Sequence, residues 1–399
     1  MIKILIISPD ILPVPAVKGG AVETLIQQLI ESKVKNNTDP QISYTVVSIK
    51  DEKICENSDD SYIYINNNFI KKTTSRVFGK ISRLFSVSRS YTNIYLREVS
   101  DLVDDYDYIV VENQPEYALP LRKKTKAKFI LHLHNDKINV NTQFLEKISE
   151  SFDYVFSVSD YVRKQVEKTS FFKSSQLKVL YNCVDVERYA TKLSVTEREQ
   201  IRNKYSVEKN AKIILYVGRI DATKGVLELV QAFNRLNHNV VLVIVGSVWF
   251  SDNRKNQFVR QLETETSGAK KSIVFTGYVD HKEISYLQQA SDIIVVPSVC
   301  EDACPLVVLE SMASYTPIIA TDSGGIPELI SNGCGVLVPR NSNNGTLIDN
   351  LQLAFENLLS NEGKGQLLAH NAWEKVQEFH INNYAKNFDK LIRDIDDEK

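Results

Sequence analysis

With 399 residues, 43% of them hydrophobic and 25% charged, the chain is long enough for two or three domains of ordinary soluble composition. Its formal net charge of −2 and the lack of a recognised nucleic-acid motif argue against a nucleic-acid partner. Five scattered cysteines are typical of reduced thiols, and no apolar run approaches the ~20 residues of a membrane span. With no signal peptide before the first predicted strand, we expect a cytoplasmic protein.

Short apolar runs alternate with helical patterns along the chain, which is typical of parallel sheets covered by helices. In the first half the predicted strands are residues 2–8, 43–49, 108–112, 128–132, 154–158 and 178–181. In the second half they are residues 212–217, 240–245, 273–276, 292–296, 317–320 and 335–338. The charged stretch 191–210 between the two sets indicates a linker with one or two helical turns. The pattern predicts an α/β protein with two doubly wound, Rossmann-like domains facing a cleft.

The first predicted strand is not followed by the glycine fingerprint of a dinucleotide-binding domain. Residues 8–18 contain no glycine, and Gly19 and Gly20 come later, just before a predicted helix. A dinucleotide cofactor is therefore not expected. Glycines at a helix entry let the backbone approach a phosphate or sugar closely, although a simple entry turn also explains them. Glu23 either reaches a binding site or is a first-turn acid favoured by the helix dipole.

A basic amphipathic segment runs from Phe69 to Arg89, with six cations and no acids. Its apolar residues at helical spacing indicate a helix that lies on an anionic lipid surface or packs on the first domain with its cations solvated. We hold both interpretations open. The first would place the protein peripherally on the inner face of the cell membrane.

The most informative stretch runs from Pro297 to Glu310, where a buried strand leads into a short acidic loop and then a helix. Pro305 is well suited to the first helical position, and the free N–H groups there form a ready anion site. Glu310 follows as a lone carboxylate among apolar neighbours, which a ligand diol would satisfy. The arrangement suits a nucleotide-sugar. The alternative is a helix whose Glu310 faces water.

Other motifs occur with this stretch in one order along the chain. They are Tyr181-Asn-Cys-Val-Asp185, Val217-Gly-Arg219 with Lys224-Gly225, Phe275-Thr-Gly-Tyr-Val279, Ser291-Asp-Ile-Ile-Val-Val-Pro-Ser298, Leu309-Glu-Ser-Met-Ala313 and Asp322-Ser-Gly-Gly-Ile-Pro-Glu328. As a set they resemble the retaining family-4 glycosyltransferases (glycosyl transferases group 1), which have the two-domain GT-B fold. The resemblance implies an acceptor-side domain over 1–192, a nucleotide-sugar-binding domain over 205–370, and a last helix within 371–399 that returns to the first domain.

The resemblance assigns donor-site roles in the second domain. Arg219 and Lys224, after Gly218, would stabilise the leaving diphosphate, and Glu310 would bind the ribose hydroxyls. The family's paired acids are two Glu residues eight apart, whereas this chain has Asp302 at the first position and Glu301 before it. We favour Asp302 for the sugar contact and keep Glu301 as the alternative. The remaining predicted donor contacts are Gly19, Gly20, Gly246, Tyr278, Val279, Ala303, Cys304, Pro305 and Leu306, with Gly277 also placed to frame the base.

In the first domain, His134 matches the family histidine that lies near the donor sugar and assists proton handling. His132, two residues earlier, is a weaker candidate, since a strand-end histidine is usually structural. Asn182 and Asp185 match a family turn in which Cys183 replaces a glycine, and we interpret them as structural. Glu328 points at the cleft by resemblance, or else caps a helix.

The implied function is a retaining, metal-independent hexosyl or related transfer from a nucleoside-diphosphate sugar, UDP-sugars favoured, to a saccharide or lipid-linked acceptor in cell-surface polysaccharide synthesis. The predicted catalytic residues are His134, Arg219, Lys224 and Asp302, with no cofactor and no metal. Because Cys300 and Cys304 lack a nearby histidine or second cysteine pair, we do not expect them to bind one. A nucleotide-sugar epimerase, a phosphorylase, and a non-catalytic nucleotide-sugar-binding protein are the alternatives.

Overall fold

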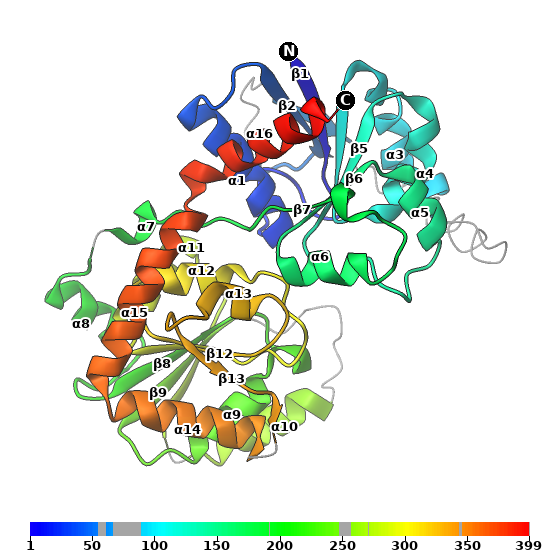
Figure 1. The fold of residues 1–399 in the computed structure, drawn as a ribbon. Helices are drawn as coiled ribbons and strands as arrows, with labels where there is room; N and C mark the ends of the chain where they lie inside the picture. The colour runs from blue at the N-terminus through cyan, green and yellow to red at the C-terminus, as the bar shows by residue number, and fades with distance from the viewer. Residues whose placement is uncertain are drawn as a thin grey trace. The chain divides into compact units, whose positions relative to one another are not determined.

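The computed structural model describes residues 1–54, 61–66, 89–190, 192–246, 257–269, 271–342 and 345–398. The chain forms two compact units. Unit 1 consists of Met1–Asn182 together with Ile381–Lys399, and unit 2 consists of Cys183–His380. Each unit has its own sheet with helices packed against it (Figure 1).

Unit 1 is built on a seven-stranded sheet in the order β3-β2-β1-β4-β5-β6-β7, with all neighbouring strands parallel. The strands are β1 (Ile2–Ile7), β2 (Ile42–Ile49), β3 (Tyr62–Ile65), β4 (Tyr108–Glu112), β5 (Lys128–Leu133), β6 (Tyr154–Ser157) and β7 (Leu177–Val179). All five residues of β4 are buried. Helices cover both faces of such a strand, which explains its continuous apolar sequence.

Five helices of unit 1 lie between these parallel strands in the sequence. They are α1 (Ala21–Asn36), α3 (Ile94–Val99), α4 (Ala118–Leu121), α5 (Leu145–Ser151) and α6 (Asp160–Glu167), and unit 1 also contains α16 (Ile381–Asp397). Short 3₁₀ turns occur at Arg89–Thr92, Val103–Asp105, Pro115–Tyr117, Arg122–Lys124 and Ser174–Gln176. Ser159 begins α6 with its side chain accepting from the Val162 N–H, a typical N-cap.

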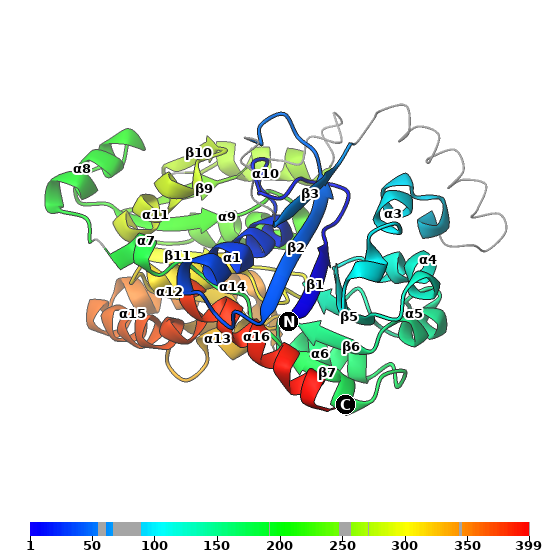
Figure 2. The ribbon, with the colours of Figure 1, turned by 90° about the horizontal axis from the view of Figure 1, so that it is seen from above.

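The carboxyl-terminal helix α16 packs on α1, far away in the sequence (Figures 1 and 2). Its Asp389 is 4% exposed and accepts hydrogen bonds from Lys33 Nζ at 2.8 Å and Thr38 Oγ1 at 2.7 Å, and a third from the Tyr44 hydroxyl. A buried carboxylate is tolerated when it is satisfied in this way. The expectation that the last helix returns to the first domain is confirmed.

Unit 2 has a six-stranded parallel sheet in the order β10-β9-β8-β11-β12-β13. Its strands are β8 (Lys212–Val217), β9 (Val240–Val245), β10 (Ile273–Gly277), β11 (Ile293–Val296), β12 (Ile318–Thr321) and β13 (Val336–Val338). Its helices are α7 (Glu187–Ala190), α8 (Val195–Lys204), α9 (Val226–Asn234), α10 (Gln257–Ser267), α11 (His281–Ala290), α12 (Leu306–Ala313), α13 (Ile326–Ile330), α14 (Leu347–Leu359) and α15 (Glu362–Val376). The two doubly wound sheets confirm the predicted α/β fold class.

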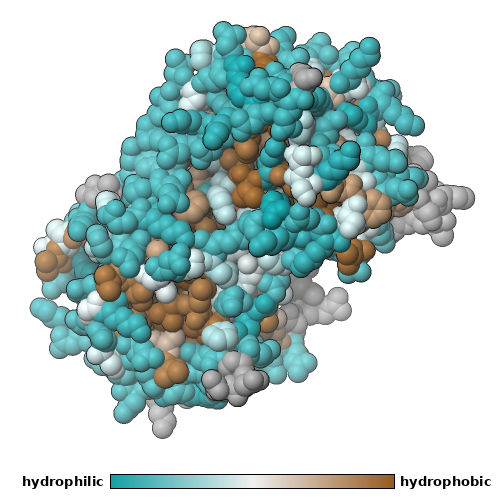
Figure 3. Space-filling model, in the orientation of Figure 1, coloured by the Kyte–Doolittle hydropathy of each residue, from teal (hydrophilic) through white to brown (hydrophobic). Residues whose placement is uncertain are grey.

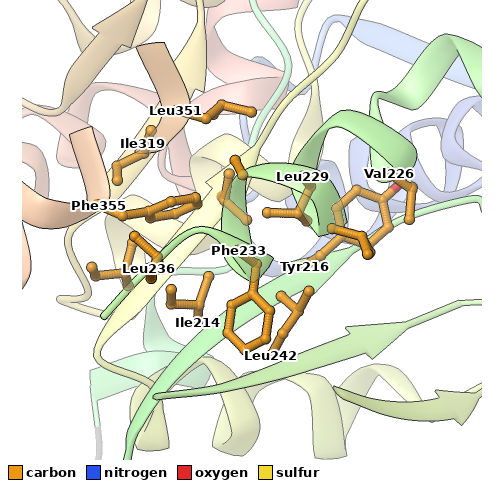
Figure 4. Packing of buried hydrophobic residues seen from close by; sticks show 14 of the residues in the cluster. Ile214, Tyr216, Val226, Leu229, Phe233, Leu236, Leu242, Ile319, Leu351 and Phe355 are labelled. Atoms are coloured by element: carbon orange, nitrogen blue, oxygen red, sulfur yellow. The ribbon is translucent and has the colours of Figure 1, made fainter. Parts of the chain in front are cut away.

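The larger core of unit 2 lies on one face of this sheet (Figure 4). Phe233 of α9 and Phe355 of α14 are fully buried there, against strand residues such as Leu242 of β9. Residues of α11, including Leu287, pack on the opposite face with Leu215 and Val243. The six-stranded sheet is therefore covered on both sides, which holds the carboxyl ends of its strands in fixed positions.

Some elements differ from the sequence-based expectation. The short edge strand β3 and the hairpin of β14 (Asn341–Ser342) and β15 (Gly345–Thr346) are not predicted. The stretch 191–210 contains a ten-residue helix, α8, which opens with a capping box between Ser194 and Glu197. Its low apolar content explains why periodicity indicates only a turn or two.

The resemblance implies one returning helix within 371–399, whereas the structure has parts of two helices there. Helix α15 ends at Val376 in unit 2, a 3₁₀ turn follows at Gln377–Phe379, and α16 begins at Ile381 in unit 1. Between them His380 is extended and pairs with Val184, whose N–H donates to the Phe379 carbonyl at 2.9 Å. The helical segment is therefore interrupted at His380, which is extended and pairs with Val184.

Hydrophilic residues predominate on the face of the molecule in Figure 3, and apolar residues gather there in a few separate groups. Across the described residues, no helix combines the length and apolar character needed to cross a bilayer. Of the basic segment 69–89, only Arg89 belongs to the part of the chain that the structure describes.

Candidate functional site

Three glycines lie at the carboxyl ends of neighbouring strands in unit 2. Gly218 follows β8, Gly246 follows β9, and Gly277 ends β10. The Gly246 N–H donates to the Gly277 carbonyl at 3.0 Å, and a Cβ on Gly246 would lie only 1.8 Å from the Gly218 carbonyl oxygen. A side chain is thus excluded at Gly246, beside the end of β8. Of the next two predicted residues, Tyr278 is 78% exposed and Val279 is buried.

Lys224 and Asp302 form an ion pair beside this edge. Lys224 ends a 3₁₀ turn, Ala222–Lys224, and its Nζ lies 2.5 Å from Asp302 Oδ1. The two side chains are only 19% and 15% exposed, so solvent screens the pair weakly. The Ser298 hydroxyl donates to the other carboxylate oxygen of Asp302. Both oxygens of Asp302 are therefore occupied by donors.

The loop that carries Asp302 is fixed by close backbone contacts with two glycines. Gly225, with φ +68°, comes so near that a Cβ would lie 1.9 Å from the Pro297 carbonyl oxygen. Gly324, with φ +55°, would place a Cβ 2.1 Å from the Asp302 carbonyl oxygen, which also accepts the Gly325 N–H at 2.7 Å. No larger residue fits either position without moving the loop. Asp302 is thus held by its backbone as well as its side chain.

Glu301 points to different partners from Asp302. Its carboxylate accepts from Arg340 Nη2 and from the Gly324 N–H, each at 2.5 Å. Arg340 also donates to the Val299 carbonyl at 2.9 Å. The neighbouring acids therefore make different contacts: Asp302 faces Lys224, and Glu301 ties its loop to Arg340.

Beyond these acids, Ala303 and Cys304 are buried and lead to the start of α12. The sequence predicts Pro305 as the first helical residue, but the structure makes it the N-cap, in extended conformation, with α12 starting at Leu306. No side chain caps this end of the eight-residue helix. Its first backbone N–H groups therefore remain suited to an anion, as the sequence suggests.

Glu310 lies on α12 and is partly buried rather than surrounded by water. It is close enough to Tyr189 of α7 to act on it electrostatically. Burial, and after it the charge of Glu310, raises the pKa of the 6% exposed Tyr189 far above its usual range. A partly buried carboxylate in the second turn of α12 is compatible with the predicted diol contact.

Arg219 is less enclosed than Lys224. Its side chain is 55% exposed and lies 3.5 Å from the Asp221 carboxylate, and its carbonyl accepts from the Tyr216 hydroxyl at 2.6 Å. Burial is the main cause that raises the pKa of Tyr216, and the charges of Asp221, Asp302 and Arg219 also act on it. Tyr216 therefore lies near two of the predicted site residues, Arg219 and Asp302.

The histidines predicted in unit 1 meet a carboxylate. His134 Nε2 lies 2.7 Å from Glu112 Oε2, and His132 Nδ1 lies 3.0 Å from the same oxygen. The two imidazole rings are 4.3 Å apart between centroids. All three side chains are at most 6% exposed. The cluster forms because β4 and β5 are paired in a register that places Glu112 opposite His132.

Electrostatics indicate that Glu112 is ionised. Burial alone would raise its pKa, but the charges and hydrogen bonds of His132 and His134 outweigh it and lower the pKa to about 2. Burial lowers the pKa of His134 below its usual range. The two histidines therefore stabilise the ionised form of Glu112.

Gly20 and Glu23 occupy the entry of α1 in the same unit. Gly20 has φ +105°, and a Cβ there would lie 2.1 Å from Glu23 Oε2. Glu23 is 5% exposed, and burial, with Glu112 adding to it, raises its pKa. The glycine at position 20 therefore makes room for the Glu23 side chain. A simple helix-entry turn does not by itself explain this close contact. Gly19 has φ +74°, and a Cβ added to it would meet no atom within 4 Å.

Three further residues named from the sequence are Asn182, Asp185 and Glu328. Asn182 is buried, and Asp185 lies in the stretch that leads to α7. Glu328 belongs to the short helix α13, and its carbonyl accepts Lys375 Nζ at 2.7 Å. Sequence reasoning did not find Glu112, Ser298 or Arg340. The available signal for Glu112 was its position at the end of a predicted strand, like His132.

Glu112, His132 and His134 offer ligand atoms that all lie within 4.8 Å of one another, a spacing at which a metal ion is conceivable. Two ligands of a tetrahedral zinc with bonds near 2.0–2.1 Å are, however, roughly 3.3 Å apart. The 2.7 Å contact between His134 and Glu112 is instead a hydrogen-bond distance. The observed arrangement fits a carboxylate shared by two imidazoles better than a metal centre.

Two Rossmann-like units and a carboxyl-terminal helix that joins the first of them define the GT-B class of glycosyltransferase folds. The structure of Anabaena Alr3699/HepE in complex with UDP-glucose is similar, with a TM-score of 0.75 at 18% identity, covering 99% of this chain and 100% of that one. The apo lipopolysaccharide outer core galactosyltransferase WaaB has a TM-score of 0.70 at 19% identity, covering 98% and 99%.

Residues 197–372, which lie in unit 2, match the family model described as glycosyl transferases group 1. The predicted group-1 assignment is confirmed, and the family-4 assignment is consistent with it. Spore coat protein SA of Bacillus subtilis is 27% identical, over 96% of this chain and all of its own length. The lipopolysaccharide 1,2-N-acetylglucosaminetransferase of Salmonella typhimurium is 23% identical, over 97% of this chain and 99% of its own.

Proposed function

We propose that this glycosyltransferase moves a sugar from a nucleoside-diphosphate sugar, UDP-sugars favoured, to a saccharide or lipid-linked acceptor in cell-surface glycan synthesis, with retention of anomeric configuration. Relatives named for a spore coat, a lipopolysaccharide and teichuronic acid biosynthesis support the cell-surface setting. Similar structures in complex with UDP or UDP-glucose support the choice of donor.

The observation that carries the proposal is the Lys224–Asp302 pair at the carboxyl edge of the unit 2 sheet. Lys224 is poorly exposed, held in place, and close to both the glycine edge and the start of α12. In this proposal the donor diphosphate binds there, between the N–H groups of α12 and the cations of Lys224 and Arg219. Charge that develops on the leaving diphosphate is then stabilised by groups already in position.

With the diphosphate placed between α12 and the two cations, the other parts of the donor reach the remaining predicted residues. Glu310 accepts hydrogen bonds from the ribose hydroxyls, and the loop of Ala303, Cys304 and Pro305 offers its backbone to the phosphates. The exposed Tyr278 and the glycines Gly218 and Gly246 frame the base. Asp302 contacts the donor sugar in preference to Glu301, because Asp302 pairs with Lys224, the proposed diphosphate ligand, whereas Glu301 is tied to Arg340 and the Gly324 N–H.

A front-face reaction agrees with the state of Asp302. Its carboxylate oxygens accept from Lys224 and Ser298, which makes it a poor nucleophile toward the anomeric carbon. In the proposed step the acceptor hydroxyl attacks from the face that the diphosphate leaves. The acceptor proton passes to the departing phosphate oxygen, so no covalent glycosyl-enzyme is formed and no metal is required.

Unit 1 supplies the acceptor side in this proposal, and His134 contacts the sugar substrate. We include a lipid-linked acceptor because the segment 69–89 has six cations and no acids. The protein would then work on the cytoplasmic side, peripherally bound to the membrane surface.

The deciding experiment is a donor panel of UDP-, GDP- and ADP-sugars, followed by thermal shift and by release of nucleoside diphosphate with and without acceptor extracts. We expect binding and turnover with at least one UDP-sugar, with activity retained in EDTA. Product without acceptor would indicate an epimerase, and a requirement for free phosphate would indicate a phosphorylase. Binding without turnover under every condition would leave a nucleotide-sugar-binding protein.

A further inference from the structure

Glu112 is the centre of a buried hydrogen-bonded cluster in unit 1. Its carboxylate lies 2.7 Å from His134 Nε2 and 3.0 Å from His132 Nδ1. An ionised carboxylate has no hydrogen to donate, so each of these ring nitrogens must carry one. The contacts therefore select the Nε2–H form of His134 and the Nδ1–H form of His132.

The other nitrogen of each ring has no partner among the residues that the structure describes. His134 Nδ1 and His132 Nε2 are both buried and make no hydrogen bond within the described residues. In a neutral imidazole the nitrogen without hydrogen is an acceptor. Leaving such an atom unpaired costs free energy, which a ligand that donates a hydrogen bond would remove.

The rest of the surroundings leave this acceptor available on His134. The Asn113 side chain accepts the His134 backbone N–H at 3.2 Å, which fixes the residue but does not involve the ring. The nearby cation, Lys137, donates instead to the Asn113 carbonyl at 2.7 Å and to Gln114 Oε1 at 3.2 Å. Among the described residues, Glu112 is thus the group that hydrogen-bonds the His134 ring, through Nε2.

We infer that Glu112 is a positioning residue that holds His134 in its Nε2–H form, so that the bare Nδ1 accepts a hydrogen bond from a hydroxyl of the bound sugar. The identity of the ligand rests on the proposed function, whereas the tautomer does not. The inference restricts the substrate: a hydroxyl satisfies Nδ1, but a carboxylate at the same position would be repelled by its lone pair.

The tautomer can be measured directly on the wild-type protein. The chain has six histidines, so long-range proton–nitrogen NMR spectra of protein labelled with ¹⁵N-histidine are simple enough to assign, with His134→Asn identifying the signal. At neutral pH we expect His134 Nε2 at a pyrrole-like shift and Nδ1 at a pyridine-like shift. A protonated Nδ1 would overturn the inference whatever the enzyme does with a donor.

The variant Glu112→Gln removes the anionic acceptor with little change of shape. We expect the His134 tautomer to become mixed and kcat for UDP-glucose hydrolysis to fall roughly tenfold or more, as happens when a histidine loses its orienting carboxylate. The affinity for UDP should be unchanged, since the nucleotide contacts belong to unit 2. Asp136→Asn removes an exposed carboxylate from the same loop and serves as the control, with wild-type tautomer and kcat.

Three results would contradict the role of Glu112: an unchanged tautomer in Glu112→Gln, an unchanged kcat, or equal losses in Asp136→Asn. Stoichiometric zinc in the purified wild-type protein, absent from Glu112→Gln, would show a metal site in its place. If no donor is turned over by the wild type, the proposed function fails, but the NMR spectrum still decides whether Glu112 sets the tautomer.

Discussion

The ammonium group of Lys224 lies 2.5 Å from a carboxylate oxygen of Asp302, although 78 residues separate them in the sequence. Both side chains are largely enclosed, and the backbone of Asp302 is fixed by Gly324 and Gly325. A bound diphosphate would share this cation with Asp302, which keeps Lys224 ordered before the donor arrives. Preorganised charge of this kind stabilises a transition state without reorganisation.

Lys224→Ala and Arg219→Ala should each lower turnover by roughly 10²-fold or more, because each removes a charge contact to the leaving diphosphate. The loss from Lys224→Ala should be the larger, since Arg219 is 55% exposed. Release of nucleoside diphosphate under saturating donor is the measurement. Lys209→Ala removes an 85% exposed lysine from the same unit and is the matched control. Near-normal rates in both test variants would remove the diphosphate assignment.

The two acids of the loop should behave differently. Asp302→Asn should reduce kcat by roughly tenfold or more, because it breaks a charge-assisted contact with Lys224 and the proposed sugar contact. Glu301→Gln should mainly loosen the loop at Arg340 and have a smaller effect on kcat. Steady-state kinetics of both variants decide the matter. The opposite order would assign the first acid position to Glu301.

Glu310→Gln should weaken nucleotide binding by about 1.5–3 kcal/mol, the usual cost of losing a hydrogen bond to a charged group. Calorimetric titration with UDP measures this directly. The control is Glu374→Gln, which changes an exposed acid on α15 of the same unit. If UDP binds equally well to the Glu310 variant, the carboxylate has no role at the ribose.

Asp389→Asn should destabilise unit 1 by about 3–5 kcal/mol, as expected when one partner of a buried ion pair is removed. Hydrogen exchange should become faster in α1 and α16, while the helices of unit 2 keep their protection. Asp394→Asn, a change on the same helix at a less buried position, should exchange like the wild type. Equal protection in both variants would show that the Asp389 contacts contribute little.

If the segment 69–89 binds membranes, co-sedimentation with vesicles should rise with anionic lipid content and fall with added salt. Replacing Lys80 and Arg83 with Glu should release the protein while leaving UDP-glucose hydrolysis intact. Neutral vesicles provide the control. Equal binding to neutral and anionic vesicles, or none to either, would favour a packed helix and a soluble acceptor.

The buried strands could be predicted from the sequence because parallel strands covered on both faces are continuous apolar runs. Strand β11 is one example, since its residues Ile293–Val296 are all buried. The edge strand β3 is not predicted because it is only four residues long. Three of its residues are only partly buried, so its sequence lacks the long apolar run of a central strand. Helix boundaries were less accurate, as Pro305 shows, because capping depends on the backbone of the preceding loop.

The contacts of the candidate site were harder to predict than its members. Lys224, Asp302 and Glu310 could be named from their motifs, but the partner of Glu301 is Arg340, 39 residues away in a segment with no motif. Glu112 became visible only with the register of β4 on β5, which decides that it faces His132. Strand ends can be read from a sequence, whereas the neighbours across a sheet depend on its topology.

The assignment of α16 to unit 1 has a consequence for biosynthesis. Unit 1 needs Ile381–Asp397 to cover α1 and to contact Lys33, Thr38 and Tyr44, so the ribosome must translate all of unit 2 before unit 1 can be completed. Unit 2, encoded without interruption, is complete earlier. During translation the contacts of Lys33, Thr38 and Tyr44 with Asp389 therefore stay unmade until α16 emerges.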